Sequence, residues 1–214
     1  MIRPDRHTVF RDRIDAARRL ALRLQAYRGH QPLVLAIPRG AVPMAQSIAS
    51  ALQGDFDVVL VRKLGAPMQP EFAVGSVDES GWAYLSPHAA AAGADADYIS
   101  TEKARQLALI RERRALYTPM RPPLNPMGRI VIVVDDGLAT GATMIAALHS
   151  LRQHGPARLI CAVPVASPEA LTLVRPLADE VVCLQAPANF QAVGQFYEDF
   201  GQVEDEQVIA LLKS

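Results

Sequence analysis

A loop that combines two acids with glycines and threonines is the segment of this chain best suited to chemistry. It reads DDGLATGAT over residues 135–143 and directly follows the apolar run 131–134. Asp135 and Asp136 can accept hydrogen bonds from vicinal hydroxyls and can help to hold Mg²⁺. Thr140 and Thr143 add hydroxyl donors, and glycine lets the backbone approach an anion closely. The loop therefore suits a ligand with a diol at one end and a monophosphate at the other, and a ribose 5-phosphate fits.

Two other phosphate-binding loops do not match this segment. The G-x-x-x-x-G-K-[ST] loop requires a lysine, and no lysine occurs between residues 135 and 143. The dinucleotide fingerprint G-x-G-x-x-G requires closer glycines than Gly137 and Gly141. Both classes of nucleotide-binding protein are therefore disfavoured.

The elements around the loop predict an α/β fold. The run 129–134 is the strongest strand in the chain, and helical spacing follows it over 143–154. The series then continues with a strand at 158–163, a helix at 168–177 and a strand at 180–184. This alternation indicates a mostly parallel central sheet with helices on both faces.

The first part of the chain continues the same pattern. Apolar residues at steps of three and four predict a helix over 10–28, and a second helix is expected over 43–52. The uninterrupted apolar runs at 33–37 and 58–61 are typical of parallel strands covered on both faces. Each of these two strands is followed by basic residues, Arg39 in one case and Arg62 with Lys63 in the other.

Residues 64–100 have a different character. Two short strand patterns, FAVGSV and WAYL, flank the sequence DESG and predict a β-hairpin. An alanine- and aspartate-rich stretch follows, which we expect to be mobile, and helical spacing returns over 101–117. The proline-rich connector PMRPPLNPMG separates this helix from the strand at 129.

Composition limits the classes of protein that remain. The chain has 214 residues, 50% hydrophobic and 21% charged, with a formal net charge of zero. These values favour one globular domain, 1–214, and argue against a generic polyanion binder. Cys161 and Cys183 lie in apolar runs and are expected to be buried thiols. No apolar stretch is long enough for a membrane span and no leader is visible, so we expect a cytoplasmic protein.

The segment VIVVDDGLATGATM, residues 131–144, resembles the binding motif for 5-phosphoribosyl-1-pyrophosphate (PRPP) in type I phosphoribosyltransferases. It has the same order of four apolar residues, two acids and a T-G-x-T phosphate loop. The order of elements agrees over about residues 30–185. Within the family the chain is most similar to a less characterised subgroup that carries IPRG, VRKLGAP and a late Gln-Phe-Tyr segment.

The resemblance implies a transferase that binds PRPP and Mg²⁺ and releases pyrophosphate. The ribose phosphate would contact Asp135, Asp136, Gly137, Leu138, Ala139, Thr140, Gly141, Ala142 and Thr143, with the two acids also placed near the metal, directly or through ribose hydroxyls or water. The loop of Arg39 and Gly40, with a strained peptide expected at that bond, and the pair Arg62 and Lys63 would contact the pyrophosphate. Catalytic roles would fall to Arg39, Lys63, Asp135 and Asp136.

The resemblance also implies a lid over about residues 64–100 and a hood built from 1–29 and 186–214 around a core of about 30–185. Glu71 and Asp78 are candidate acid/base residues of the lid, although a solvated surface role suits each of them better. Ala139 stands where hypoxanthine-guanine enzymes carry an Asp, so a 6-oxopurine acceptor is disfavoured. An adenine-like or other nucleobase-like acceptor stays open, with Phe196 or Tyr197 as weak stacking candidates or simply as packing residues.

Two alternative functions use the same loop. One is a regulatory module that binds PRPP or a nucleotide without catalysis, and the other is a sugar-phosphate hydrolase. Nucleic-acid binding is disfavoured because a solvated face explains the basic helix 101–117 more simply. The chain ends carry opposite charge, with eight Arg against three Asp in 1–30 and seven acids against Lys213 in 179–214. We therefore expect the ends to meet, within one chain or across a homodimer.

Overall fold

A parallel five-stranded sheet forms the centre of the protein. The computed structural model describes residues 9–70, 72–119 and 122–213. The strand order is β2-β1-β6-β7-β8, and every neighbouring pair is parallel. The strands are β1 (Leu33–Ala36), β2 (Asp55–Val58), β6 (Ile130–Val134), β7 (Arg158–Val165) and β8 (Glu180–Gln185). The α/β fold predicted from the sequence is thus confirmed.

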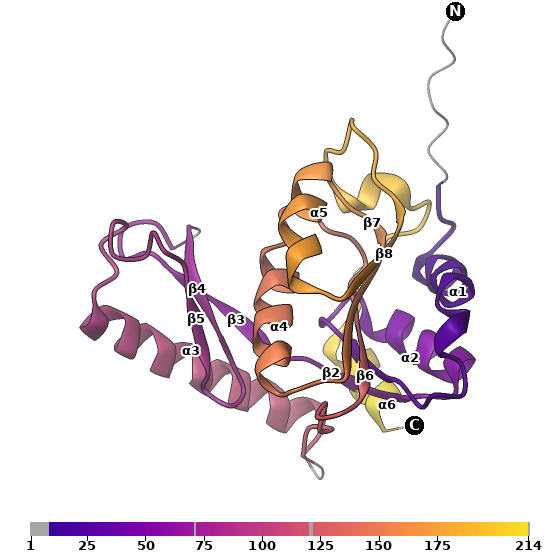
Figure 1. Cartoon of the computed structure of the whole chain (residues 1–214), viewed down its shortest axis with the longest axis horizontal. Coiled ribbons are helices and arrows are strands. Elements are labelled where there is room, and N and C mark those ends of the chain that lie inside the picture. Colours follow the sequence, from indigo (N-terminus) through magenta and orange to yellow (C-terminus); the bar gives the residue numbers. More distant parts are fainter. Residues whose placement is uncertain (1–8, 71, 120–121, 214) are drawn as a thin grey trace, which may run out of the picture.

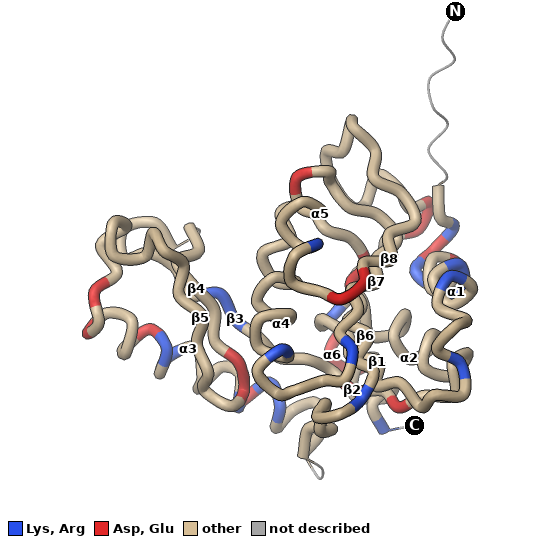
Figure 2. The backbone as a smooth tube through the Cα atoms, viewed as in Figure 1, with Lys and Arg blue, Asp and Glu red and all other residues tan. Residues whose placement is uncertain are grey.

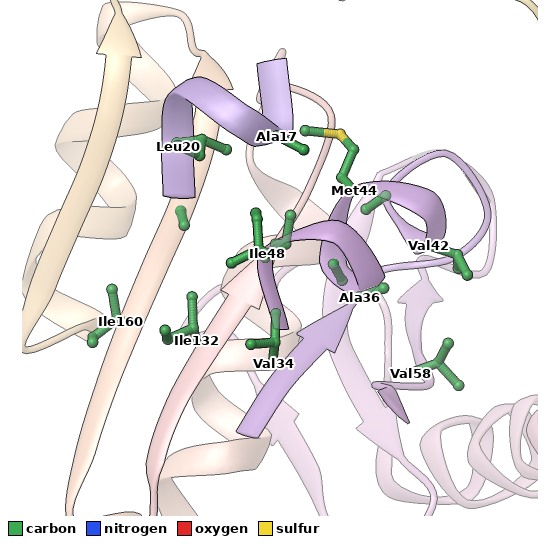
Figure 3. Packing of buried hydrophobic residues seen from close by; sticks show 14 of the residues in the cluster. Ala17, Leu20, Val34, Ala36, Val42, Met44, Ile48, Val58, Ile132 and Ile160 are labelled. Atoms are coloured by element: carbon green, nitrogen blue, oxygen red, sulfur yellow. The ribbon is translucent and has the colours of Figure 1, made fainter. Parts of the chain in front are cut away.

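Helices cover both faces of this sheet (Figure 1). One face carries α1 (Arg13–Arg23) and α2 (Val42–Leu52), and the other carries α4 (Ala142–Gln153) and α5 (Pro168–Val174). Successive strand residues point to opposite faces. Figure 3 shows one face, where side chains of both helices pack over the strands; the labelled residues include Ala17, Leu20, Met44, Ile48, Val34, Ile132 and Ile160. The alternate residues, such as Leu33 and Val131, form a second core under α4 and α5.

A second, antiparallel sheet extends from the side of α4. It consists of β3 (Val61–Gly65), β4 (Ala73–Asp78) and β5 (Ala83–Leu85), and the long helix α3 (Ala96–Tyr117) packs on it. In Figure 1 this unit projects away from the central sheet. The predicted hairpin is therefore present as β4 and β5, and α3 begins five residues before the predicted helix at 101.

The predicted strand at 58–61 is wrong, because two strands of different sheets meet there. β2 ends at Val58, and β3 begins at Val61 in the second sheet. The apolar pattern does not predict the start of β2, because this part of the strand contains acidic residues, which rarely occupy strands. Asp57 is only 1% exposed, and its carboxylate accepts hydrogen bonds from Arg114 Nη1 at 3.1 Å and from the Leu124 amide at 3.0 Å. These tertiary partners stabilise a charge that sequence propensity disfavours in a strand.

The two ends of the chain meet, as their charges predicted. The Phe10 amide donates to the Phe196 carbonyl at 2.8 Å, and the Glu198 amide donates to the Phe10 carbonyl at 2.8 Å. The tail itself contains the short 3₁₀ turn η3 (Val193–Phe196) and the helix α6 (Asp205–Leu212). Two further 3₁₀ turns, η1 (Gln25–Tyr27) and η2 (Arg175–Leu177), follow α1 and α5. Across the described part of the chain, no helix is both long and apolar enough to cross a bilayer.

Candidate active site

The chemistry-bearing loops leave the carboxyl ends of two adjacent central strands. β1 pairs with β6 from Leu33 opposite Val131 to Ala36 opposite Val134. From these two strands the chain continues in opposite directions, toward β2 on one side and toward β7 on the other. Such a reversal of strand order opens a crevice where parallel α/β proteins bind ligands. The sheet therefore places the loop after β1 beside the acid pair after β6.

The second acid of the pair is bound within the protein. Asp136 Oδ2 accepts from Arg13 Nε and forms an ion pair with Arg13 Nη2, each at 2.9 Å. The two side chains are 17% and 12% exposed. The Asp136 amide donates to Asp135 Oδ1 at 2.9 Å. Arg13 thus belongs to the site although its place in an amphipathic helix gave no sequence signal for it.

The fold treats the two carboxylates differently. Burial raises the pKa of Asp135 well above its usual range, and the neighbouring charge of Asp136 adds to the shift. Burial also raises the pKa of Asp136, but the Arg13 guanidinium opposes that change. Of the two, Asp136 is the carboxylate bonded to a guanidinium, and Asp135 is therefore the better placed to bind a ligand.

The loop after β1 packs directly against this ion pair. A Cβ added at Gly40 would lie 2.0 Å from Asp136 Oδ2 and 3.2 Å from Arg13 Nε, so glycine is required by this close approach. The peptide between Pro38 and Arg39 is cis. The unusual bond thus lies one residue earlier than the Arg39–Gly40 position expected from the sequence.

The second half of the acid loop forms the start of α4. Gly141, with φ at +75°, precedes the helix, and a side chain would be strained in this left-handed conformation. Thr140 and Thr143 are exposed, as are Ala139 and Ala142, whereas Leu138 is buried. The first amides of a helix lack intrahelical partners and attract anions. The loop therefore presents an exposed helix start, and phosphate binding there stays a prediction.

The predicted cations converge on this loop from two other elements. Arg39 and Arg62 line a cavity of about 290 Å³ together with Thr143 of α4. Arg62 and Thr143 also line an adjoining cavity of about 520 Å³, which Lys63 joins. Arg62 and Lys63 lie within β3 and not at the end of a central strand as expected, because the chain has already entered the second sheet. Figure 2 shows a basic segment of β3, in blue, beside α4, and the two elements are in contact.

The two aromatic residues proposed to stack on an acceptor are buried. Phe196 is 1% exposed and lies in the core, and Tyr197 is 6% exposed and donates its hydroxyl to the Asp136 carbonyl at 2.6 Å. Neither ring offers a face to a ligand, which contradicts the stacking role and supports the packing alternative. Phe200 is the more exposed ring, at 36%, and the Arg13 guanidinium lies 3.9 Å from its centroid.

The candidate acid/base residues of the lid are not brought to the site. Asp78 is 3% exposed and accepts hydrogen bonds from the Ser80 and Trp82 amides in the hairpin turn and from Ser150 Oγ. A carboxylate committed to these bonds has a structural role, so the prediction for Asp78 is wrong. Glu71 lies outside the described residues.

The tail covers the acid side of the loop. A Cβ at Gly137 would lie 2.6 Å from Val193 Cγ1, so the tail approaches the loop backbone at this glycine. Arg13 Nη1 reaches past the acid pair to donate to the Gly201 carbonyl at 2.5 Å. The first helix and the tail are thus joined beside Asp136, and their role as a hood stays a prediction.

Comparison with known sequences defines the family. Over residues 10–200 the chain matches the sequence profile of the phosphoribosyl transferase domain. The chain therefore belongs to the phosphoribosyl transferase domain family. The parallel sheet and the loop positions described above agree with this membership.

Individual relatives are found among both sequences and structures. Two proteins of Mycobacterium tuberculosis, from strains CDC 1551 / Oshkosh and H37Rv, are 42% identical over 205 residues and bear the name "Putative phosphoribosyl transferase". The match covers 95% of this chain and 46% of each relative, so the chain spans about half their length. The crystal structure of the protein TT1426 from Thermus thermophilus is 49% identical, with a TM-score of 0.88, and the match covers 95% of this chain and 97% of that one.

Proposed function

We propose that this protein is a phosphoribosyltransferase that uses PRPP and Mg²⁺ to transfer ribose 5-phosphate to a nucleobase or a similar nitrogen acceptor. One observation carries the proposal. An acid pair and an exposed helix start lie in the same segment after β6, and Thr143 of that helix lines one cavity with two arginines, Arg39 from the loop after β1 and Arg62 of β3. These groups match the diol, the 5-phosphate and the pyrophosphate of PRPP, respectively.

The residues at the crevice fit a magnesium ion that is held mostly by the substrate. No group of three or more His, Cys, Asp or Glu side chains suited to a metal occurs among the described residues. Mg²⁺ commonly takes one or two carboxylates and completes its shell with phosphate oxygens and water. Asp135 would supply a carboxylate oxygen directly or through water, whereas Asp136 Oδ2 is already bound by Arg13. When bound, the ion would neutralise charge on the departing pyrophosphate.

The protein's own residues would perform the remaining tasks. Asp135 would accept hydrogen bonds from the ribose hydroxyls, and the start of α4 with Thr140 and Thr143 would hold the 5-phosphate. Arg39 and Arg62 would bind the pyrophosphate and stabilise the charge that it gains as its bond to C1 of the ribose breaks. The acceptor nitrogen then forms the new bond to C1. Lys63, which lines the adjoining cavity, would add a further cation.

The acceptor is expected to approach from the side of the joined chain ends. Phe200 and the Arg13 guanidinium form the partly exposed surface there, next to Asp136. With Ala139 in the loop, the chain has no carboxylate at that position to handle a purine proton. An adenine-like or other nucleobase-like ring therefore remains the preferred acceptor class.

The test is an acceptor panel assayed for pyrophosphate release from PRPP and Mg²⁺. We expect one nucleobase-like acceptor to give stoichiometric pyrophosphate and ribosylated product, with Asp135→Asn lowering the rate by at least about a hundredfold. Binding of PRPP without turnover on any acceptor would instead favour the regulatory alternative. Acceptor-independent formation of ribose 5-phosphate, faster than spontaneous decay, would favour the hydrolase.

A further inference from the structure

A third arginine, Arg113 of α3, lines the same cavity as Arg39 and Arg62. The three residues come from α3, from the loop after β1 and from β3, so three separate elements each contribute an arginine to the lining of one space of about 290 Å³. Thr143 at the start of α4 lines this space as well. Positive charges that lie close together repel one another, and an anion between them removes this repulsion.

The described structure provides that anion from the start of α6. Asp205 Oδ1 lies 2.6 Å from Arg113 Nη1, and Asp205 Oδ2 lies 3.9 Å from Arg39 Nη1. Glu204 Oε2 lies 3.3 Å from the same Arg39 nitrogen. Two carboxylates of the chain's own tail therefore neutralise two of the cations of the cavity.

These ion pairs are open to exchange. The side chains of Arg113 and Glu204 are 41% and 55% exposed, and exposed ion pairs contribute little to stability. A diphosphate carries more charge than a carboxylate, and pairs of its oxygen atoms can accept two parallel hydrogen bonds from a guanidinium. An entering diphosphate can thus replace the tail carboxylates at Arg39 and Arg113.

We propose that Arg113 is a pyrophosphate-binding residue, and that Glu204 and Asp205 hold Arg39 and Arg113 as internal counter-ions until the anion enters. This inference rests on the proposed function and adds to it a binding residue and a competing acidic segment. It also gives α6 a role, because diphosphate and the start of this helix compete for the same two arginines.

The first experiment measures binding of inorganic diphosphate with MgCl₂ to the full chain by titration calorimetry. Arg113→Gln should weaken binding by at least about tenfold, since one charge-assisted contact is lost. Arg113→Lys, which retains the charge, should recover part of the loss. The matched control is Arg111→Gln, which removes an exposed arginine from the same helix and should leave the affinity unchanged.

The second experiment tests the competition. Glu204→Gln removes a counter-ion of Arg39 and should tighten diphosphate binding about twofold to fivefold. Glu206→Gln removes an equal charge from the same helix turn at an exposed position and should have no such effect.

The outcomes separate this inference from the proposed function. Equal affinities for Arg113→Gln and Arg111→Gln would overturn the role of Arg113, even in an active transferase. Equal effects of Glu204→Gln and Glu206→Gln would overturn the competition. Diphosphate binding that depends on Arg113 in a protein without transferase activity would support the subsite and reject the proposed reaction. A wild-type protein that binds neither diphosphate nor PRPP would reject both.

Discussion

Adjacent aspartates at the end of β6 illustrate how the fold gives different roles to identical side chains. Asp136 is bonded to Arg13 and packs on Gly40, so it joins the first helix to the loop after β1. The pKa of Asp135 is raised because burial disfavours its ionised form and the charge of Asp136 lies beside it. Asp136 is therefore expected to support the structure, and Asp135 is expected to bind ligand at some cost in stability.

We expect Asp135→Asn to stabilise the ligand-free protein at neutral pH. A pKa raised in the folded state means that folding opposes ionisation, and each tenfold change in proton affinity corresponds to about 1.4 kcal/mol. The loss of stability caused by ionising buried Asp135 is absent at a pH below the pKa of this residue in the unfolded chain. It grows as the pH rises from that value to the pKa in the folded protein, and it is complete above the folded-state pKa. Urea unfolding from pH 4 to 8 should therefore give a higher free energy of unfolding for the variant than for the wild type, and this difference should increase with pH. A constant difference, or a less stable variant throughout, would contradict this prediction, and Asp97→Asn on the exposed start of α3 is the control.

Arg13→Gln should have the opposite effect on stability. It leaves the Asp136 carboxylate in a nearly buried position without its cation, which costs about 3 kcal/mol. The double variant with Asp136→Asn should recover part of this free energy of unfolding, because the stranded charge is removed. Arg18→Gln changes an exposed arginine of the same helix and serves as the control. If the two single substitutions change the free energy of unfolding additively in the double variant, the two side chains are not coupled.

At the scale of elements, α3 connects the second sheet to the rest of the protein through its arginines. Arg114 donates to Glu79 Oε2 at 2.8 Å in the hairpin turn, to the Val58 carbonyl at 3.0 Å at the end of β2, and to the buried Asp57. Its neighbour in the same helix, Arg113, reaches the start of α6. Adjacent residues of one helix thus contact the hairpin, the central sheet and the tail.

Arg114→Gln should therefore weaken the attachment of the second sheet. Asp57 and Glu79 would both lose their guanidinium partner, and we expect the free energy of unfolding to fall by about 3 kcal/mol. Amide hydrogen exchange should increase in β3 to β5 more than in β6 and β7. If the exchange of both sheets rose equally, the arginine would stabilise the whole fold and not this attachment. Arg111→Gln, exposed on the same helix, should change stability by less than about 0.5 kcal/mol.

At the scale of the whole molecule, the first and last described segments of the chain are joined beside Asp136. The sequence predicted this meeting from opposite charge, but backbone hydrogen bonds and ring contacts join the ends. Phe10 is 1% exposed, and its ring centroid lies 5.4 Å from that of Tyr197. The charges therefore accompany the contact more than they create it. A homodimer and a cytoplasmic location stay predictions.

Phe10→Ala should consequently separate the ends at a cost of about 3 kcal/mol, as for other buried aromatic residues. Chemical denaturation measures the loss, and limited proteolysis of the tail should become faster. Leu22→Ala is the matched control, because Leu22 lies on the neighbouring helix and is 71% exposed. A loss no larger than that of the control would show that the ring does not hold the ends together.

The fold class and the loop of residues 135–143 could be predicted from the amino-acid sequence alone. Strand periodicity and the motif 131–144 are local features, because backbone geometry and residue spacing alone produce them. The residues that surround this loop depend on the packing of segments far apart in the chain. Arg13 reaches Asp136 from 123 residues away, and Arg113 reaches the cavity through the packing of α3. The same packing leaves Phe196 and Tyr197 buried, and Asp78 is hydrogen-bonded within the hairpin turn. Such choices depend on burial and on partners distant in sequence, and a local pattern contains neither.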